Sequence, residues 1–289
     1  MSQIKRTVVV TGATSGIGFS VCDLLLQSGF RVFAVGRCEE NCDKAQSQLA
    51  AKHPGAELRF FCGDLVHQHE VLRVAGEIKN ALEESCGGAL FGLVNNAGCV
   101  RSWYMTSDEG YEQQFALNHL AGFLLARELM PQLVKAGGRV LFTASQSHRH
   151  TRMRWNDLML QRGYHPLFAY KQSKLCNLLT ALALNGRYGG DGVRAYCVDP
   201  GLVDTGIGCK RTGWLVNFVW NARRRHGRAP ELAAATYAYL LNCMEPPQGL
   251  YFRDCRPESH SREVDAKNAE RLYQISLKLS GAKEGEELL

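Results

Sequence analysis

Tyr170 and Lys174 are the two side chains of this sequence whose types and spacing point most directly to chemistry. They are four residues apart at the start of a helical pattern, which places them on one face of a helix. A tyrosine with an ordinary pKa of about 10 is a poor base near neutral pH, and lowering that pKa by about two to three units takes roughly 3–4 kcal/mol. Because a nearby ammonium can supply this stabilisation, the pair predicts a tyrosine acid–base catalyst assisted by a lysine.

Two more polar residues have sequence positions that suit the same chemistry. Ser145 follows Arg139–Ala144, an apolar strand candidate, and its hydroxyl can polarise a carbonyl beside the phenol. Asn118 falls within Glu109–Lys135, a long helical pattern in which a side-chain amide is unfavourable unless it bonds something specific. We therefore expect both side chains to serve the site.

A glycine-rich turn directly follows the first strand candidate, Thr7–Thr11, and opens a helix. Free N–H groups and the positive end of the helix dipole suit a pyrophosphate at such a place, and glycines let phosphates approach the backbone. The alternative is a simple tight turn between a strand and a helix. The predicted phosphate-binding residues of this turn are Gly12, Ser15, Gly16, Ile17 and Gly18.

Arg37 indicates which dinucleotide is bound. It ends the second strand candidate, where an NAD site usually carries an acidic residue that bonds the ribose 2′-hydroxyl. A guanidinium can instead pair with the 2′-phosphate of NADP through two hydrogen bonds. The alternative is a solvent-exposed arginine after a strand. We expect the cofactor to be NADP(H).

Two polar turns extend the predicted cofactor groove along the carboxyl ends of the third and fourth strands. Asp64, followed by Leu65, can present a carboxylate to the adenine amino group. Asn96, Ala97 and Gly98 form a polar turn beside the dinucleotide. Each turn alone is ordinary, but with the glycine loop they outline a binding groove.

The chemistry needs a scaffold, and the chain alternates short apolar runs with longer helical patterns, as repeated βαβ units do. We predict one α/β domain, a doubly wound Rossmann domain with a mostly parallel seven-stranded sheet, over residues 1–280, with a flexible tail at 281–289. The predicted strands are Thr7–Thr11, Arg31–Gly36, Leu58–Cys62, Leu90–Asn95, Arg139–Ala144, Val193–Val198 and Gly249–Phe252. The predicted helices are Gly16–Ser28, Asn41–Lys52, His67–Glu84, Glu109–Lys135, Phe168–Tyr188, Pro230–Leu241 and Ser261–Leu277.

Composition excludes several other classes of protein. The 289 residues are 45% hydrophobic and 21% charged, with a net charge of +6 whose densest run is the local Arg223–Arg225, so we expect no nucleic-acid partner. The eleven cysteines include no C-x-x-C, and no secretory signal precedes the first strand, which favours reduced thiols in the cytoplasm. Cys38 and Cys42 lack a second pair at matching spacing, so no metal is expected. No run approaches the roughly 18 apolar residues of a membrane span.

The ordered motifs resemble those of the classical short-chain dehydrogenase/reductase family from Thr7 to about Leu277. The matching pieces are Thr11–Gly18, Asp64-Leu65, Asn95–Gly98, Asn118, Ser145, Tyr170–Lys174 and Asp199-Pro200-Gly201. The resemblance implies a catalytic tetrad of Asn118, Ser145, Tyr170 and Lys174. It also implies that Tyr170 and Lys174 contact the cofactor, that Lys174 holds the nicotinamide ribose, and that Pro200, Gly201 and Thr205 lie beside the cofactor.

Within that family the chain is similar to the retinol dehydrogenase-like branch, on Arg139–His148, Arg149–Phe168, Ser173–Asn177 and Gly249–Cys255. It departs from the common pattern in Phe142–Ala144, where asparagine and a first serine are usual. The branch often carries an N-terminal membrane anchor, and we expect none here, because no long apolar run precedes the first predicted strand. We expect a small lipophilic carbonyl or alcohol as substrate.

A substrate lid is expected over residues about 202–228. Its aromatic part, Trp214–Trp220, can cover a lipophilic substrate, pack on the body, or dock at a bilayer with Arg223–Arg225 facing lipid phosphates. Peripheral membrane contact through Trp214–Arg225 and a homodimer both stay open. His148, His150 and His165 are interpreted as polar residues at the pocket rim rather than as a catalytic base. The alternative functions are a non-catalytic NADP(H)-binding sensor or regulator and a peripheral membrane protein.

Overall fold

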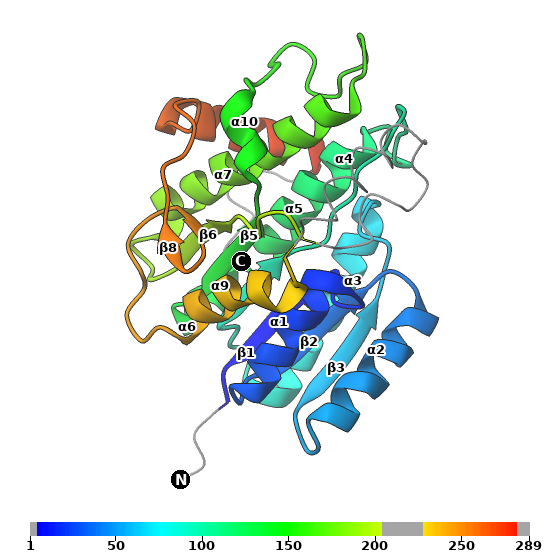
Figure 1. Cartoon of the computed structure of the whole chain (residues 1–289), viewed down its shortest axis with the longest axis vertical. Coiled ribbons are helices and arrows are strands. Elements are labelled where there is room, and N and C mark those ends of the chain that lie inside the picture. The colour runs from blue at the N-terminus through cyan, green and yellow to red at the C-terminus, as the bar shows by residue number, and fades with distance from the viewer. Residues whose placement is uncertain (1–4, 204–227, 282–289) are drawn as a thin grey trace.

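A single mixed sheet forms the centre of the computed structural model, which describes residues 5–203 and 228–281 (Figure 1). Its strand order is β3-β2-β1-β4-β5-β6-β7-β8, with β1 to β7 parallel and β8 antiparallel to β7. The strands are β1 Thr7–Thr11, β2 Arg31–Gly36, β3 Leu58–Cys62, β4 Gly92–Asn95, β5 Arg139–Thr143, β6 Arg194–Val198, β7 Tyr251–Arg253 and β8 Arg256–Pro257. The doubly wound α/β fold expected from the sequence is confirmed.

Helices cover both faces of the sheet, because most of its strands are apolar on both sides. The α-helices are α1 Gly16–Gln27, α2 Glu39–Lys52, α3 Gln68–Cys86, α4 Gln113–Phe115, α5 Ala121–Glu128, α6 Met130–Ala136, α7 Pro166–Tyr188, α9 Pro230–Asn242 and α10 Ala266–Leu279. A π-helical segment, η1, spans Ala116–Leu120, and a 3₁₀ segment, η2, spans Gln146–His150.

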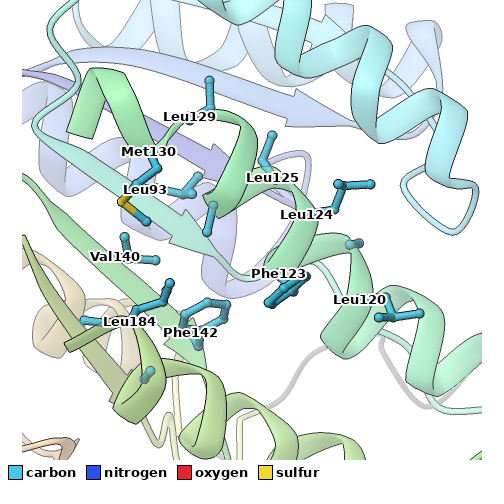
Figure 2. Close-up of a cluster of buried hydrophobic side chains, with 14 of the residues drawn as sticks. Leu93, Leu120, Phe123, Leu124, Leu125, Leu129, Met130, Val140, Phe142 and Leu184 are labelled. Atoms are coloured by element: carbon cyan, nitrogen blue, oxygen red, sulfur yellow. The ribbon is translucent and has the colours of Figure 1, made fainter. Parts of the chain in front are cut away.

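The core lies in two apolar layers, one on each face of the sheet. One layer joins α1 and α9 to alternate residues of β1 and β2, such as Val8 and Val32. The other joins α3, α5 and α7 to the opposite side of the strands. Figure 2 shows part of that layer, in which Leu93 of β4 and Phe142 of β5 meet Phe123 of α5 and Leu184 of α7. These buried layers fix the strand ends that carry the candidate site.

The strand order reverses between β1 and β4. The chain first builds outward from β1 to β2 and β3, then returns to add β4 on the other side of β1. In open α/β sheets a ligand crevice forms outside the carboxyl ends of the strands at such a reversal. The loop after Thr11 and the turn after Asn95 both leave the sheet at this point.

The predicted helix Glu109–Lys135 is wrong as one continuous helix. The segment divides into α4, η1, α5 and α6. Pro131 stands in the first turn of α6, where proline is tolerated because its missing N–H has no helical partner, and the break falls at Leu129. The π-helical segment is set by tertiary bonds of Asn118, which helical periodicity does not encode.

The sheet has eight strands where seven were predicted. The additional strand, β8, consists of two residues and pairs with β7 through a turn in which Asp254 and Cys255 adopt positive φ. A two-residue strand has no periodicity to detect. The remaining predicted elements are present, with ends shifted by a few residues.

Several expectations concern residues beyond those described. Thr205, most of the expected lid and residues 282–289 lie outside the described residues, as does the segment Trp214–Arg225. In the described ranges, no helix has the length and apolar character needed to cross a membrane. The described cysteines are all free thiols.

Candidate functional site

The glycine loop joins β1 to α1 and brings backbone N–H groups to one end of a groove. Gly12 and Gly16 adopt positive φ of +66° and +57°, which L side chains rarely accept. A Cβ atom on Gly18 would overlap the carbonyl oxygen of Gly12 and lie 2.7 Å from Nδ2 of Asn96. Gly18 therefore allows the first turn of α1 to approach the loop closely.

The turn after β4 holds the glycine loop in place. The Thr11 hydroxyl accepts hydrogen bonds from the backbone N–H groups of Asn96 and Ala97, both at 3.0 Å. Nδ2 of Asn96 donates to the Thr11 carbonyl oxygen, also at 3.0 Å. Asn96 and Ala97 thus fix the loop as well as line the groove.

The groove has a volume of about 1190 Å³, part of which is open to solvent. Its lining includes ten of the predicted cofactor residues: Gly12, Ser15, Gly16, Ile17, Arg37, Asp64, Leu65, Asn96, Ala97 and Gly98. Thr14, Cys38, Asn41 and Val66 also line it and were not predicted, because nothing in their spacing distinguishes them from ordinary turn residues.

The donor set of this groove fits a phosphorylated dinucleotide. Ser15 precedes α1 without a side-chain capping bond, so its side chain satisfies none of the N–H groups of the first turn. These groups and the helix dipole suit a pyrophosphate. Arg37 is exposed at the groove, where its guanidinium can reach a ribose phosphate. Within the described residues no cluster of side chains could hold a metal ion.

Ser145 and Tyr170 meet where β5 ends and α7 begins. Ser145 has extended backbone angles, φ −164° and ψ 147°, directly before η2. Its hydroxyl accepts hydrogen bonds from the backbone N–H and the hydroxyl of Ser147, at 3.3 and 3.1 Å. The Tyr170 side chain also forms a hydrogen bond with the Ser145 side chain. The two hydroxyls can therefore converge on one substrate oxygen.

Lys174 is buried one helical turn after Tyr170. Its Nζ lies 5.5 Å from the centre of the Tyr170 ring and donates a hydrogen bond to the Thr143 carbonyl oxygen at 2.9 Å. The same oxygen accepts a hydrogen bond from Nδ2 of Asn177 at 3.1 Å. The predicted shared helix face of Tyr170 and Lys174 is thus present, and the carboxyl end of β5 holds the ammonium.

Asn118 connects this centre to the groove through the π-helical segment. Its Oδ1 accepts the Cys99 N–H at 2.7 Å, and its Nδ2 donates to the Cys99 carbonyl oxygen and to the Ser173 hydroxyl, both at 3.0 Å. A Cβ atom on Gly98 would lie 3.0 Å from Oδ1 of Asn118 and 3.8 Å from Nζ of Lys174. Asn118 and Lys174 therefore adjoin the Gly98 end of the groove.

Burial controls proton affinity at this centre. It raises the pKa of Tyr170 to about 12, and the negative charge of Asp199 adds to the rise. Burial also lowers the pKa of Lys174 to about 8. This rise is opposite to the lowered tyrosine pKa expected from the sequence, because desolvation of the phenolate outweighs the lowering effect of the hydrogen bond with Ser145.

The Asp199-Pro200-Gly201 turn follows β6 beside this centre. The buried Asp199 accepts the Gly201 N–H at 2.9 Å and the Tyr251 hydroxyl at 2.7 Å. Pro200 and Gly201 are partly exposed at this carboxyl edge of the sheet, although neither is among the lining of the groove. Tyr251 belongs to β7, so a late strand fixes the turn.

The three histidines near Ser145 differ in their surroundings. His150 and His165 are exposed, as expected of rim residues. His148 is fully buried and hydrogen bonds within the protein, so its assignment to the pocket rim is wrong. Sequence periodicity gave no signal for this burial, because η2 is a short 3₁₀ segment without a helical repeat.

Comparison with known proteins covers nearly the whole chain. The family described as short chain dehydrogenase matches residues 6–214. Retinol dehydrogenase 12 of Mus musculus is 34% identical over 280 residues, which are 96% of this chain and 86% of the relative. Polyprenol dehydrogenase of Mus musculus is 31% identical over 298 residues, which cover 98% of this chain and 86% of the relative.

Solved structures share the fold. An uncharacterized protein from Mycobacterium paratuberculosis aligns with a TM-score of 0.73 and 26% identity, over 96% of this chain and 94% of its own. An alcohol dehydrogenase from the archaeon Thermococcus sibiricus, complexed with 5-hydroxy-NADP, aligns with a TM-score of 0.65 and 20% identity. The alignment covers 88% of this chain and 100% of that structure. At that identity the second likeness concerns the fold alone.

Proposed function

This chain belongs to the short-chain dehydrogenase family, and we propose that it is an oxidoreductase that uses NADP(H) to interconvert a lipophilic alcohol and its carbonyl compound. The observation that carries the proposal is the meeting of Ser145, Tyr170 and Lys174 beside the Gly98 end of the dinucleotide-sized groove. A protein that only bound the cofactor would need neither hydroxyl. The retinol dehydrogenase-like resemblance agrees with the relatives of this chain.

The proposed chemistry assigns one task to each side chain. When bound, the nicotinamide supplies or accepts the hydride. In reduction, Ser145 and Tyr170 donate hydrogen bonds to the substrate carbonyl oxygen, and Tyr170 then protonates the developing alkoxide. With its pKa raised to about 12, the Tyr170 hydroxyl keeps its proton at neutral pH and suits the role of donor. Oxidation uses the same groups in reverse.

Lys174 is suited to return the proton to Tyr170. Its pKa, lowered to about 8, lies close enough to neutral pH for the ammonium to lose and regain a proton. Both Nδ2 hydrogens of Asn118 are used by Cys99 and Ser173. A water relay between Lys174 and solvent therefore requires the free lone pair of Oδ1 or the backbone carbonyl of Asn118.

The preference for NADP(H) rests on Arg37. It is exposed, lines the groove and stands after β2, where the ribose is expected. Glu39 and Glu40, the nearby acids, belong to the first turn of α2. A guanidinium in this place favours a phosphate over a hydroxyl, which supports NADP(H) over NAD(H).

The proposed substrate class is a lipophilic alcohol or aldehyde. Two of the relatives are named for retinol and polyprenol, both long apolar alcohols. The predicted lid with Trp214 and Trp220 would add apolar surface. Peripheral membrane contact through Trp214–Arg225, a cytoplasmic location and a homodimer remain predictions. Flotation with liposomes tests the membrane contact, and the molecular mass in solution tests the homodimer.

The deciding experiment follows NADPH oxidation with retinaldehyde, steroid ketones, fatty aldehydes and small polar ketones. We expect retinaldehyde or a fatty aldehyde to give the highest kcat/KM. Equal efficiency on a short polar ketone would contradict the lipophilic substrate. NADPH binding without turnover of any carbonyl or alcohol would instead favour a cofactor-binding sensor.

A further inference from the structure

His148 is fully buried three residues after the proposed catalytic Ser145, and it hydrogen bonds at both ring nitrogens. Its Nδ1 lies 2.6 Å from the Ser145 carbonyl oxygen, which also accepts the His148 backbone N–H at 3.1 Å. Its Nε2 lies 3.3 Å from the backbone nitrogen of Ser261. A carbonyl can only accept and an amide N–H can only donate, so these partners require the neutral ring with its proton on Nδ1.

This arrangement leaves His148 no nitrogen with which to act on a substrate. Burial also lowers its pKa and keeps the ring neutral. If His148 were protonated, its Nε2–H would face the Ser261 N–H, and two hydrogen-bond donors would oppose each other. This contact also disfavours protonation of the ring. The side chain is therefore suited to hold backbone groups rather than to transfer protons.

The backbone groups that His148 joins are far apart in the sequence. Ser145 lies two residues after β5, whereas Ser261 lies in the segment after β8. The His148 ring also packs edge-on against the Tyr251 ring, with 4.9 Å between ring centres. The Tyr251 hydroxyl donates a hydrogen bond to one carboxylate oxygen of Asp199, and the other oxygen accepts a hydrogen bond from the Gly201 N–H. The catalytic serine and the Asp199–Gly201 turn are thus fixed to the same C-terminal part of the sheet.

We propose that His148 is a positioning residue, which sets the orientation of the Ser145 hydroxyl by anchoring the Ser145 carbonyl to the segment that contains Ser261. The inference rests on the proposed function, because Ser145 needs a fixed orientation only if it holds a substrate oxygen. Ser145 directly precedes the five-residue 3₁₀ segment η2, whose internal hydrogen bonds are weaker than those of an α-helix. Without the imidazole, the Ser145 carbonyl oxygen keeps only its hydrogen bond from the His148 N–H. The Ser145 backbone is then held less firmly, and the Ser145 hydroxyl can turn away from Tyr170.

The first test compares His148→Ala with Asn185→Ala. Asn185 is a matched control because its side chain also donates to one backbone carbonyl and accepts from one backbone N–H, both of Ala195 at 2.8 Å, near the far end of α7. In His148→Ala we expect kcat for the best aldehyde of the screen to fall by up to about 100-fold, because the reacting groups are misplaced. The NADPH Kd should change less than about twofold, since no residue that lines the cofactor groove is altered. Asn185→Ala should lower the Tm by an amount comparable to that in His148→Ala and should leave kcat unchanged.

A second pair of variants covers the case in which His148→Ala does not fold. The amide nitrogen of asparagine can take the place of Nδ1, whereas the longer glutamine places its amide near Nε2. His148→Asn should therefore recover more kcat than His148→Gln. If glutamine recovers as much as asparagine, or if the two alanine variants lose kcat equally, the positioning role is wrong.

An observation independent of turnover completes the test. In ¹⁵N-labelled protein, long-range imidazole spectra at pH 7 should show His148 neutral with the proton on Nδ1, assigned by its loss in His148→Asn. A proton on Nε2 would overturn the inference. An unmodified protein that reduces no carbonyl contradicts the proposed function, whereas an active unmodified protein with a fully active His148→Ala contradicts this inference alone.

Discussion

Tyr170 and Lys174 show how one environment changes two proton affinities in opposite directions. Burial disfavours the charged form of each, so the pKa of the phenol rises to about 12 and that of the ammonium falls to about 8. The spacing of the pair was visible in the sequence, but the extent of burial was not. The result suits Tyr170 to proton donation at neutral pH.

Replacing Tyr170 with phenylalanine should abolish turnover while leaving NADPH binding intact. The change removes only the oxygen that donates the proton, so we expect kcat to fall about 10²–10⁴-fold or more. Single-turnover NADPH oxidation and a fluorescence titration of NADPH measure the two effects. Tyr164→Phe is a useful control, because that hydroxyl bonds Gln114 and Glu112 away from Lys174. Near-normal turnover of Tyr170→Phe would falsify the mechanism.

Arg37→Asp should reverse the cofactor preference. The unmodified protein is expected to bind NADPH more tightly than NADH, because the guanidinium can pair with the 2′-phosphate. An aspartate repels that phosphate and can instead bond the ribose hydroxyl of NADH. Titration of both proteins with both cofactors tests this, and Arg59→Asp controls for net charge from an exposed position on β3. Equal affinities for the two cofactors in the unmodified protein would show that Arg37 does not select.

At the scale of elements, the first turn of α1 and the loop after β1 depend on close backbone approach at Gly18. We expect Gly18→Ala to weaken NADPH binding at least about tenfold, because the loop must shift to admit the methyl group and its N–H groups lose their alignment. Gly76→Ala is the control, since a Cβ atom there meets nothing within 4 Å and alanine favours a helix. Calorimetric titration compares the two, and equal NADPH affinities would contradict the argument.

Elements with strong local signals could be predicted from the sequence. The strands Thr7–Thr11, Arg31–Gly36 and Leu58–Cys62 were predicted with their observed bounds. Short, largely apolar runs between turns are typical of strands in a parallel sheet. The groove residues followed from their places after these strands. By contrast, the π-helical segment depends on Asn118 bonding Cys99 and Ser173, a tertiary arrangement that no local pattern records.

The site contains a second feature that the sequence could not reveal. His148 is polar and lies in the segment between Ser145 and Tyr170, so its residue type favoured a surface position. It is buried because β7, β8 and the following segment fold back over η2 and supply Tyr251 and the Ser261 N–H as partners. Such contacts join residues more than a hundred positions apart, and a single sequence carries no signal for them.

At the scale of the whole molecule, α10 closes the face formed by η1, α5 and α7. His119 of η1 lies at this junction, fully buried, with Nε2 2.9 Å from the Ser276 hydroxyl of α10 and Nδ1 3.5 Å from the Thr180 hydroxyl of α7. Burial lowers its pKa to about 3. We therefore expect the imidazole to be neutral where the C-terminal helix docks.

The burial of His119 and His148 predicts that the folded protein loses stability as the pH falls below about 6.5. Both histidines have a lower pKa in the folded than in the unfolded chain, so the unfolded state takes up more protons in this range and folding becomes less favourable. The buried Glu112, whose pKa burial raises, acts in the opposite direction at the acidic end of the range. Carboxylates whose pKa is lowered in the folded protein, such as Asp23, add to the loss of stability at lower pH still.

Urea unfolding at pH 7, 6 and 5 measures this loss, and His119→Gln separates its source. The unmodified protein should become less stable at each step. His119→Gln should start less stable at pH 7 but show a shallower decline, by about 1 kcal/mol per pH unit between pH 6 and 5, because one buried group no longer titrates on unfolding. His69→Gln is the control, since that side chain is 65% exposed on α3 and should leave the decline unchanged. If His119→Gln declines as steeply as the unmodified protein, the junction with α10 does not depend on a neutral imidazole, and acid must weaken the fold through other groups.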